Sequence, residues 1–263
     1  MSDNAIVFID SGVGGLPYLE MTKEFLPEQN FVYVADNKNF PYGEKNSKEL
    51  TKIIIRLIES IVERLNPVLI VIACNTASVV ALSTLRTKFG IPFVGVVPAI
   101  KPAVEYSGKG SIGLLATRKT IEDPYTDELI KKFASGCIVK KYAGIDLVEF
   151  VEKKYFISSD KEKLQIVSEA SNYFTDNNID SLILGCTHFI HLAEYFKEIL
   201  GNSVDIIDSR QGVVKQIIRL IKNDKVLPVA KKRDIFYMTG DGIEKKNYMK
   251  FADKFDLFWG GNL

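Results

Sequence analysis

Nine short apolar runs, separated by segments of helical character, constrain the fold of this 263-residue chain most strongly. They read AIVFID, FVYVAD, PVLIVIA, PFVGVV, SIGLLAT, CIVKKYA, SLILGC, VDIID and DIFYMTG. Most are nearly continuous in apolar residues, which is typical of parallel strands buried on both faces. Between them, SKELTKIIIRLIESIVERL repeats apolar residues at helical spacing, at Leu50, Ile54, Leu57, Ile58, Ile61 and Leu65. The alternation predicts a doubly wound α/β fold.

A weak two-part rhythm indicates that the chain forms two similar lobes, each a mostly parallel sheet flanked by helices. A strand ending at Asp10 precedes Cys74 by about the distance at which a strand ending at Ala116 precedes Cys186. The segments VVPAIKPAVEYSGKG and DSRQG resemble crossovers between lobes. We therefore predict a first lobe of residues 1–97 plus 208–263, completed by the carboxy-terminal strand DIFYMTG and helix KKNYMKFADKF, and a second lobe of residues 98–207.

The charge balance and the apolar segments exclude several classes of partner. Thirty-four Lys and Arg against 33 Asp and Glu leave a formal charge of +1, so no strong field attracts nucleic acid or an anionic membrane. The amino terminus lacks a basic segment followed by a signal-length apolar run, and no window reaches the roughly 18 apolar residues of a membrane span. We expect a cytoplasmic protein.

Three cysteines, Cys74, Cys137 and Cys186, are too few and too odd in number for a disulfide framework. A free cysteine taken alone is usually a small buried hydrophobe. Cys137 begins a predicted strand with no polar motif beside it, so we assign it to packing.

Cys74 and Cys186 share a different setting. Cys74 follows the strand VLIVIA and precedes the helical pattern ASVVALSTLRTKF, while Cys186 follows SLILG and precedes HLAEYFKEIL. In an open α/β sheet the carboxyl ends of the strands form the ligand-binding edge. The amino end of a helix also favours a thiolate over a thiol. Both cysteines are therefore placed for acid/base work.

Polar residues follow both thiols directly: Asn75 and Thr76 after the first, Thr187 and His188 after the second. Their side chains and the free backbone N–H groups of a helix start would bind a carboxylate. The alternative is that Asn and Thr simply cap helices, and capping is compatible with ligand binding.

Two loops reach the same edge of the first sheet. Asp10 and Ser11, followed by Gly12 to Gly15, supply a carboxylate, a hydroxyl and a permissive backbone; the alternative is a turn with Asp10 capping the next helix. A dinucleotide-binding loop is a rival interpretation, since Asp36 ends the second strand, but Pro17 replaces the third glycine of that fingerprint. The loop after Asp36 brings Tyr42 and Gly43 toward the edge.

The chain has two histidines, His188 and His191. With Cys186 they would still need a fourth ligand for structural zinc, so we predict no metal site. His188 is better interpreted as an acid/base neighbour of Cys186, and His191 as a surface or capping residue.

Five motifs, in order and at similar spacing, span nearly the whole chain: IDSGVGGL, YVADNKNFPYG, VIACNTAS, GLLATRKT and LILGCTHF. In these motifs the chain resembles bacterial glutamate racemases of the cofactor-independent aspartate/glutamate racemase group. The histidine of GCTH favours the glutamate branch over the aspartate branch.

The resemblance implies that L-glutamate and D-glutamate are interconverted between two α/β lobes, each of which supplies one catalytic cysteine. Cys74 would act on the D enantiomer with help from Asp10, and Cys186 on the L enantiomer with help from His188. An acidic residue of LVEFVEKKYFISSD would assist Cys186; we favour Glu152 over the nearby Glu149. The remaining residues implied to bind substrate or help are Ser11, Tyr42, Gly43, Asn75, Thr76 and Thr187.

The same resemblance implies a homodimer without cofactor that supplies D-glutamate for peptidoglycan precursors. The sequence also lacks a pattern like a pyridoxal phosphate lysine site, which agrees with cofactor-free chemistry. Developing carbanion charge would be stabilised by Ser11, Asn75, Thr76 and the helix amino termini. Three rivals remain open: a single-thiol hydrolase using Cys186 and His188, a nucleotide-binding protein, and a regulatory protein that binds an acidic amino acid without turnover.

Overall fold

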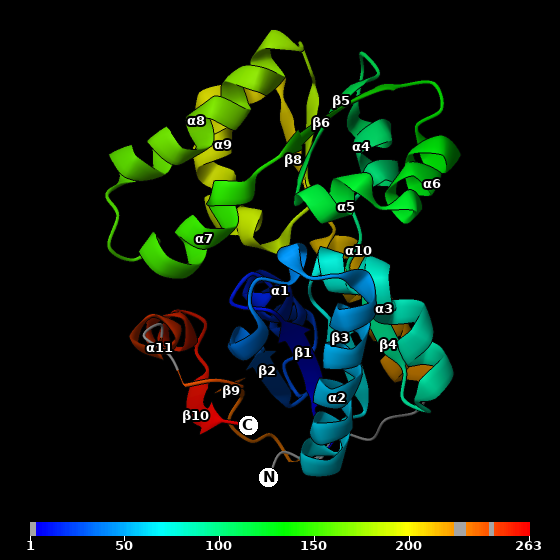
Figure 1. Ribbon diagram of the computed structural model, residues 1–263, viewed down its shortest axis with the longest axis vertical. Coiled ribbons are helices and arrows are strands. Elements are labelled where there is room, and N and C mark those ends of the chain that lie inside the picture. Colours follow the sequence, from blue (N-terminus) through cyan, green and yellow to red (C-terminus); the bar gives the residue numbers. More distant parts are fainter. Residues whose placement is uncertain (1–3, 224–229, 242–244) are drawn as a thin grey trace. The chain divides into compact units, whose positions relative to one another are not determined.

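Strands and helices alternate along the chain, as the apolar runs predict. The computed structural model describes residues 4–223, 230–241 and 245–263 (Figure 1). These residues form two units, one of Met1–Val96 with Arg210–Leu263 and the other of Val97–Ser209. The sequence predicts boundaries at 97/98 and 207/208, and the two units divide at 96/97 and 209/210.

The first unit is built on a six-stranded sheet with the order β10-β9-β2-β1-β3-β4, in which every pair of neighbours is parallel. Its strands are β1 (Ile6–Asp10), β2 (Phe31–Ala35), β3 (Leu69–Ile72), β4 (Phe93–Gly95), β9 (Ile235–Met238) and β10 (Phe258–Asn262). The central strands β1, β2 and β3 are buried along their whole length, which explains their continuous apolar sequence.

Helices α2 (Ser47–Leu65) and α3 (Asn75–Lys88) pack against each other and share a core with Val7 and Ile9 of β1. The buried side chains of α2 are the six predicted ones, Leu50, Ile54, Leu57, Ile58, Ile61 and Leu65. Helix α1 (Leu16–Phe25) contacts β2 and packs against α10 (Arg210–Asn223), which contacts β4. Helix α11 (Lys245–Lys254) contacts β10.

The second unit has a four-stranded parallel sheet with the order β6-β5-β7-β8. Its strands are β5 (Ser111–Ala116), β6 (Ile138–Ala143), β7 (Ser181–Leu184) and β8 (Asp205–Ile207). Its helices are α4 (Ile100–Tyr106), α5 (Arg118–Glu122), α6 (Pro124–Phe133), α7 (Ile145–Lys154), α8 (Asp160–Asp176) and α9 (Ala193–Leu200). Side chains of β5 share a core with α4 and α6, while Gly113 lies so close to Phe174 of α8 that a Cβ would approach its ring to 2.7 Å.

The two sheets share one strand order. The first contains β2-β1-β3-β4 and the second β6-β5-β7-β8, so in both the first strand lies between the second and the third. Each cysteine motif follows the third strand of this set, β3 or β7. The prediction of two similar α/β lobes is thereby confirmed, and β9 and β10 are an addition at the β2 edge of the first sheet.

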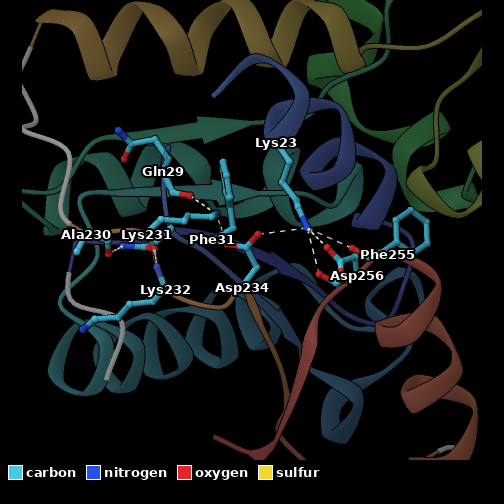
Figure 2. Close-up of polar contacts among 10 residues, drawn as sticks. Lys23, Gln29, Phe31, Ala230, Lys231, Lys232, Asp234, Phe255 and Asp256 are labelled. Atoms are coloured by element: carbon cyan, nitrogen blue, oxygen red, sulfur yellow. Dashed lines mark hydrogen bonds and ion pairs between the residues drawn. The ribbon is translucent and has the colours of Figure 1, made fainter. Parts of the chain in front are cut away.

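The carboxy-terminal segment is anchored where β9 begins (Figure 2). Asp234 accepts a hydrogen bond from the backbone N–H of Phe31 at 3.0 Å and ion pairs with Lys231 and Lys23 at 2.8 and 3.2 Å. Lys23 also donates to the backbone carbonyl oxygen of Asp256, beyond α11. These contacts fix the start of β9 beside β2, so the carboxy-terminal strand lies in the first unit.

Two local expectations need correction. Strand β10 is not among the nine apolar runs, because it is an edge strand with alternating exposure and a Gly260-Gly261 pair. The segment after Cys186 does not enter an α-helix directly. A 3-10 helix, η3 (Thr187–Leu192), comes first, and α9 begins at Ala193. Within the described residues, no helix is both long and apolar enough to cross a membrane.

Candidate active site

The first thiol, Cys74, lies at the carboxyl end of β3 and occupies the N-cap position of α3, with 7% of its surface exposed. The backbone holds it tightly: Ala73 donates to the carbonyl of Ile9 at 2.7 Å, and Ser78 donates to the carbonyl of Cys74 at 2.9 Å. The thiol is therefore buried at the positive end of a 14-residue helix.

Asn75 follows Cys74 as the first residue of α3 and is 3% exposed. Because Cys74 occupies the N-cap position, Asn75 is not the cap of this helix. Within the part of the chain that the structure describes, neither polar atom of its side-chain amide has a hydrogen-bond partner. Buried amides are almost always satisfied, so this one is available to a ligand. Thr76 is buried beside it.

Asp10 ends β1, the strand next to β3, and is fully buried. Its carboxylate accepts hydrogen bonds from the Ser11 hydroxyl at 3.1 Å and the Gly12 N–H at 3.3 Å. Gly15 occupies the N-cap position of α1, so the interpretation of Asp10 as the cap of that helix is wrong.

The glycine-rich loop is held by the protein itself. The Tyr33 hydroxyl accepts from the Gly15 N–H at 3.1 Å and donates to the Gly12 carbonyl at 2.8 Å. A Cβ on Gly15 would approach that of Ala73 to 2.6 Å, so glycine lets the loop pack against the residue before Cys74. The loop supports the thiol site, and its hydrogen bonds to Tyr33 argue against a dinucleotide cradle.

Tyr42 and Gly43 lie in a short 3-10 helix, η2 (Tyr42–Glu44), that packs against α3. The Tyr42 hydroxyl donates to the Asp36 carboxylate at 2.6 Å. Burial raises the Tyr42 pKa well above its usual value, and the negative charge of Asp36 raises it further, with smaller contributions from Cys74 and Asp10. The side chain is therefore a neutral phenol within electrostatic range of Cys74.

The second thiol, Cys186, follows β7 and Gly185 and is 6% exposed. His188 Nδ1 lies 3.9 Å from its Sγ, and His188 Nε2 lies 2.6 Å from Oε1 of Glu152, a residue of α7. His188 and Glu152 are 2% and 1% exposed. The three side chains form a buried relay of thiol, imidazole and carboxylate.

The approach of α7 to η3 explains how Glu152 reaches His188. Gly144, just before α7, lies so close to Phe189 of η3 that a Cβ would come within 3.0 Å of its ring. Glu149 lies on the exposed side of α7, where it pairs with Lys153 at 2.6 Å, and this pairing lowers the Glu149 pKa. Of the two carboxylates considered, only Glu152 contacts the imidazole.

The three remaining residues, Thr187, His191 and Cys137, differ in burial and in what they contact. Thr187 is buried beside Cys186, which occupies the N-cap position of η3, so Thr187 is not the cap. His191 is half-buried, with its ring 5.8 Å from that of Tyr155. Cys137 is half-buried against the core of the second unit. Among the described residues, no three His, Cys, Asp or Glu side chains gather as a metal site would require.

Sequence reasoning missed two residues of the first site. In the sequence, Asp36 fits only a nucleotide fingerprint, yet its buried carboxylate accepts from Tyr42, Asn39 and Thr239. Thr239 follows β9, and its contact with Asp36 spans 203 residues. The sequence does hold a signal for Thr239, because it lies near the end of the run DIFYMTG and therefore at the carboxyl edge of the sheet.

The fold places the chain in a class of known enzymes, the amino-acid racemases, which are isomerases. A family model described as Asp/Glu/Hydantoin racemase matches residues 18–217, and the chain belongs to this family.

The relatives it resembles carry a more specific description. The chain is 37% identical over 258 residues to the glutamate racemase of Treponema pallidum (strain Nichols), covering 97% of this chain and 95% of the relative. It is 44% identical over 228 residues to that of Shewanella woodyi, covering 86% and 84%. The crystal structure of Escherichia coli glutamate racemase in complex with L-glutamate and the activator UDP-MurNAc-ala matches with a TM-score of 0.89 at 33% identity, covering 99% of this chain and 98% of that one.

Proposed function

We propose that this protein interconverts L-glutamate and D-glutamate by a two-base mechanism, with Cys74 and Cys186 as the bases and without a cofactor. The substrate is supported by the relatives described as glutamate racemases. The observation that carries the mechanism is that equivalent strand ends of two sheets each bear a buried thiol with polar helpers.

The proposed chemistry is a proton exchange at the α-carbon. The thiolate of one cysteine takes the α-proton and becomes a thiol, leaving a carbanion. The thiol of the other cysteine donates its proton to the opposite face and becomes a thiolate. No atom is gained or lost by the substrate, and the enzyme ends with the thiolate on the other cysteine. The reverse reaction starts from that state.

Each half of the proposed site supports its thiol differently. The amino end of α3 stabilises a Cys74 thiolate, and Asp10 is the nearby carboxylate that we assign as its helper. In the other half, the Glu152 carboxylate selects the imidazole tautomer in which Nε2 carries the proton, so His188 Nδ1 can accept a proton from Cys186. We assign Cys74 to D-glutamate and Cys186 to L-glutamate.

Substrate binding and carbanion stabilisation are assigned to groups at the same strand ends. The Asn75 amide, which has no hydrogen-bond partner among the described residues, would bind the substrate beside Cys74 together with Thr76 and Ser11. Thr187 would do so beside Cys186. Tyr42 and Gly43 would also bind the substrate beside Cys74. Because these donors are held before the reaction, they stabilise developing negative charge without reorganisation.

The test is to incubate the pure protein with L-glutamate in D₂O without added cofactor, and separately with D-glutamate. We expect each enantiomer to give the other, with deuterium at the α-carbon of the product. Dialysis against a chelator and addition of a carbonyl-trapping reagent should leave the rate unchanged. Absence of both inversion and α-deuterium exchange would contradict the proposal.

A second candidate, a single-thiol hydrolase, is favoured by one observation: the Cys186, His188 and Glu152 relay also suits a nucleophilic cysteine. Cys74→Ser separates the two functions. A hydrolase would retain full activity toward an ester or amide substrate, whereas the racemase would lose inversion.

The biological setting belongs to the same proposal. D-glutamate made by this enzyme would enter peptidoglycan precursors, so deleting its gene should create a requirement for D-glutamate. A cytoplasmic location fits the chemistry, because a reducing compartment keeps both thiols available as acid and base. We retain the homodimer as a prediction, which light scattering on the purified protein would test.

A further inference from the structure

The hydroxyl group of Thr239 joins two residues of the loop that follows β2, Asp36 and Lys38. It donates to Asp36 Oδ1 at 2.6 Å and accepts from the backbone N–H of Lys38 at 3.3 Å. Thr239 follows β9, whose register pairs Met238 with Ala35, so the next residues of the two strands, Thr239 and Asp36, face each other. At the other end of β9, Asp234 is held by Lys23 and Lys231 (Figure 2).

Further contacts join the residues after β9 to the loop that follows β2. The side-chain oxygen of Asn37 accepts from the N–H groups of Thr239 and Gly240 at 3.1 and 2.8 Å, and its Nδ2 donates to the Gly240 carbonyl at 3.1 Å. A Cβ on Gly240 would approach the backbone of Lys38 to 3.2 Å. The carboxy-terminal segment is thus held in one position relative to the loop that leads to Tyr42.

Asp36 carries the connection to Tyr42. Its carboxylate is 1% exposed and receives three side-chain donors: Tyr42 at 2.6 Å and Asn39 at 3.0 Å on Oδ2, with Thr239 and Asn39 on Oδ1. A buried carboxylate depends on such donors, because water cannot replace them. If the hydroxyl of Thr239 were replaced by a methyl group, Oδ1 would keep only Asn39, and the carboxylate would turn to recover a donor.

We infer that Thr239 is a positioning residue that acts through Asp36 to hold Tyr42 and Gly43 in their substrate-binding arrangement. This inference rests on the proposed function, in which Tyr42 and Gly43 bind glutamate. The carboxy-terminal strand thereby contributes to a site whose other assigned residues in the first unit all lie before residue 77. Thr239 itself has no contact with the reacting atoms in this assignment.

The test compares Thr239→Val, which keeps the shape and removes the hydroxyl, with Thr239→Ser, which keeps the hydroxyl. Thr22→Val is the matched control, because Thr22 is a buried threonine of the same unit that donates only within α1, to the Tyr18 carbonyl at 2.7 Å. We expect Thr239→Val to raise KM for both enantiomers about tenfold, with kcat changed less than about threefold. Thr239→Ser and Thr22→Val should keep the wild-type KM.

A purely structural role would give a different pattern. It would lower the folded fraction and therefore kcat, with KM unchanged, and the loss would follow the melting temperature across the variants, including Thr22→Val. That pattern, a wild-type KM in Thr239→Val, or equal defects in Thr239→Val and Thr239→Ser would overturn the inference.

Crystal structures of the two Thr239 variants separate this inference from the proposed function. If the wild-type protein does not racemise glutamate, the proposed function fails, but the positioning of Tyr42 can still be judged. We expect the contact between Tyr42 and Asp36 to be broken or displaced in Thr239→Val and kept in Thr239→Ser. An unchanged contact in Thr239→Val would overturn the inference whatever the activity.

Discussion

The two thiols occupy equivalent places in the strand order, yet their surroundings differ. Cys74 lies at the amino end of a 14-residue α-helix and within electrostatic range of the neutral phenol of Tyr42, and the buried Asp10 ends the neighbouring strand. Cys186 lies at the start of a six-residue 3-10 helix and contacts an imidazole that a buried glutamate holds. A long helix stabilises a thiolate through its dipole, whereas a short 3-10 helix has a smaller dipole and stabilises a thiolate less. Equivalent positions in the two sheets thus give a thiol different neighbours: a helix amino end at Cys74 and an imidazole at Cys186.

The largest expected effect tests whether both halves are needed. Cys74→Ser and Cys186→Ser should each lower racemisation by more than about a thousandfold, because in the proposed mechanism each removes one of the two proton carriers. Cys137→Ser is the matched control and should keep wild-type activity. Inversion at more than a few per cent of the wild-type rate in either Cys74→Ser or Cys186→Ser would contradict the proposal that both thiols are needed.

The next prediction tests whether His188 assists Cys186 alone. His188→Asn should lower kcat/KM about a hundredfold. Since the enantiomers have equal free energy in water, kcat/KM must fall equally in both directions.

The asymmetry should instead appear in isotope effects. With proton transfer at Cys186 slowed in His188→Asn, α-deuterated L-glutamate should show a larger primary isotope effect than in the wild type, and D-glutamate a smaller one. Equal changes for both enantiomers would show that His188 serves both thiols.

A smaller effect tests the carboxylate behind the imidazole. Glu152→Gln should lower kcat/KM about tenfold, because an amide can donate to His188 Nε2 and favour the wrong tautomer. Glu149→Gln is the control on the same helix. It should keep wild-type kinetics, since Glu149 only pairs with Lys153 at the surface. The assignment of Glu152 would be wrong if the two variants behaved alike.

The last prediction concerns the stability of the first unit rather than the rate. Tyr42→Phe removes the hydrogen bond to Asp36 and should lower the free energy of unfolding by about 2 kcal/mol at pH 8. Burial raises the folded-state pKa of Tyr42, so its stabilising contribution is complete below the unfolded value of about 10 and declines as the pH rises above it.

The stability difference between wild type and Tyr42→Phe should therefore narrow above pH 10, as measured by denaturant unfolding. Tyr106→Phe, at an exposed tyrosine, controls for the general response to alkali. A difference that stays constant between pH 8 and pH 11 would contradict the pKa shift.

Much of the fold could be predicted from local pattern, and the exceptions have physical causes. The nine apolar runs all form strands, and those buried along their whole length, such as β1, β2 and β3, need apolar residues on both faces. β10 was not predicted because its residues alternate in exposure and include Gly260 and Gly261, so it does not form a continuous apolar run. The expectation of an α-helix directly after Cys186 failed because apolar periodicity does not distinguish the 3-10 turn of η3 from an α-helical start.

The sequence by itself determined the strand and helix alternation, the pairing of CNTA with GCTH, and the separation of Cys137 from the other thiols. These depend on residues close together in the chain. Only the tertiary structure decided that Glu152 rather than Glu149 meets His188, that Tyr33 holds the glycine loop, and that Thr239 reaches Asp36 across 203 residues. Such contacts depend on which strands become neighbours and how closely helices pack. Strand order and helix packing depend on the burial of the whole core, so they cannot be predicted from a short stretch of sequence.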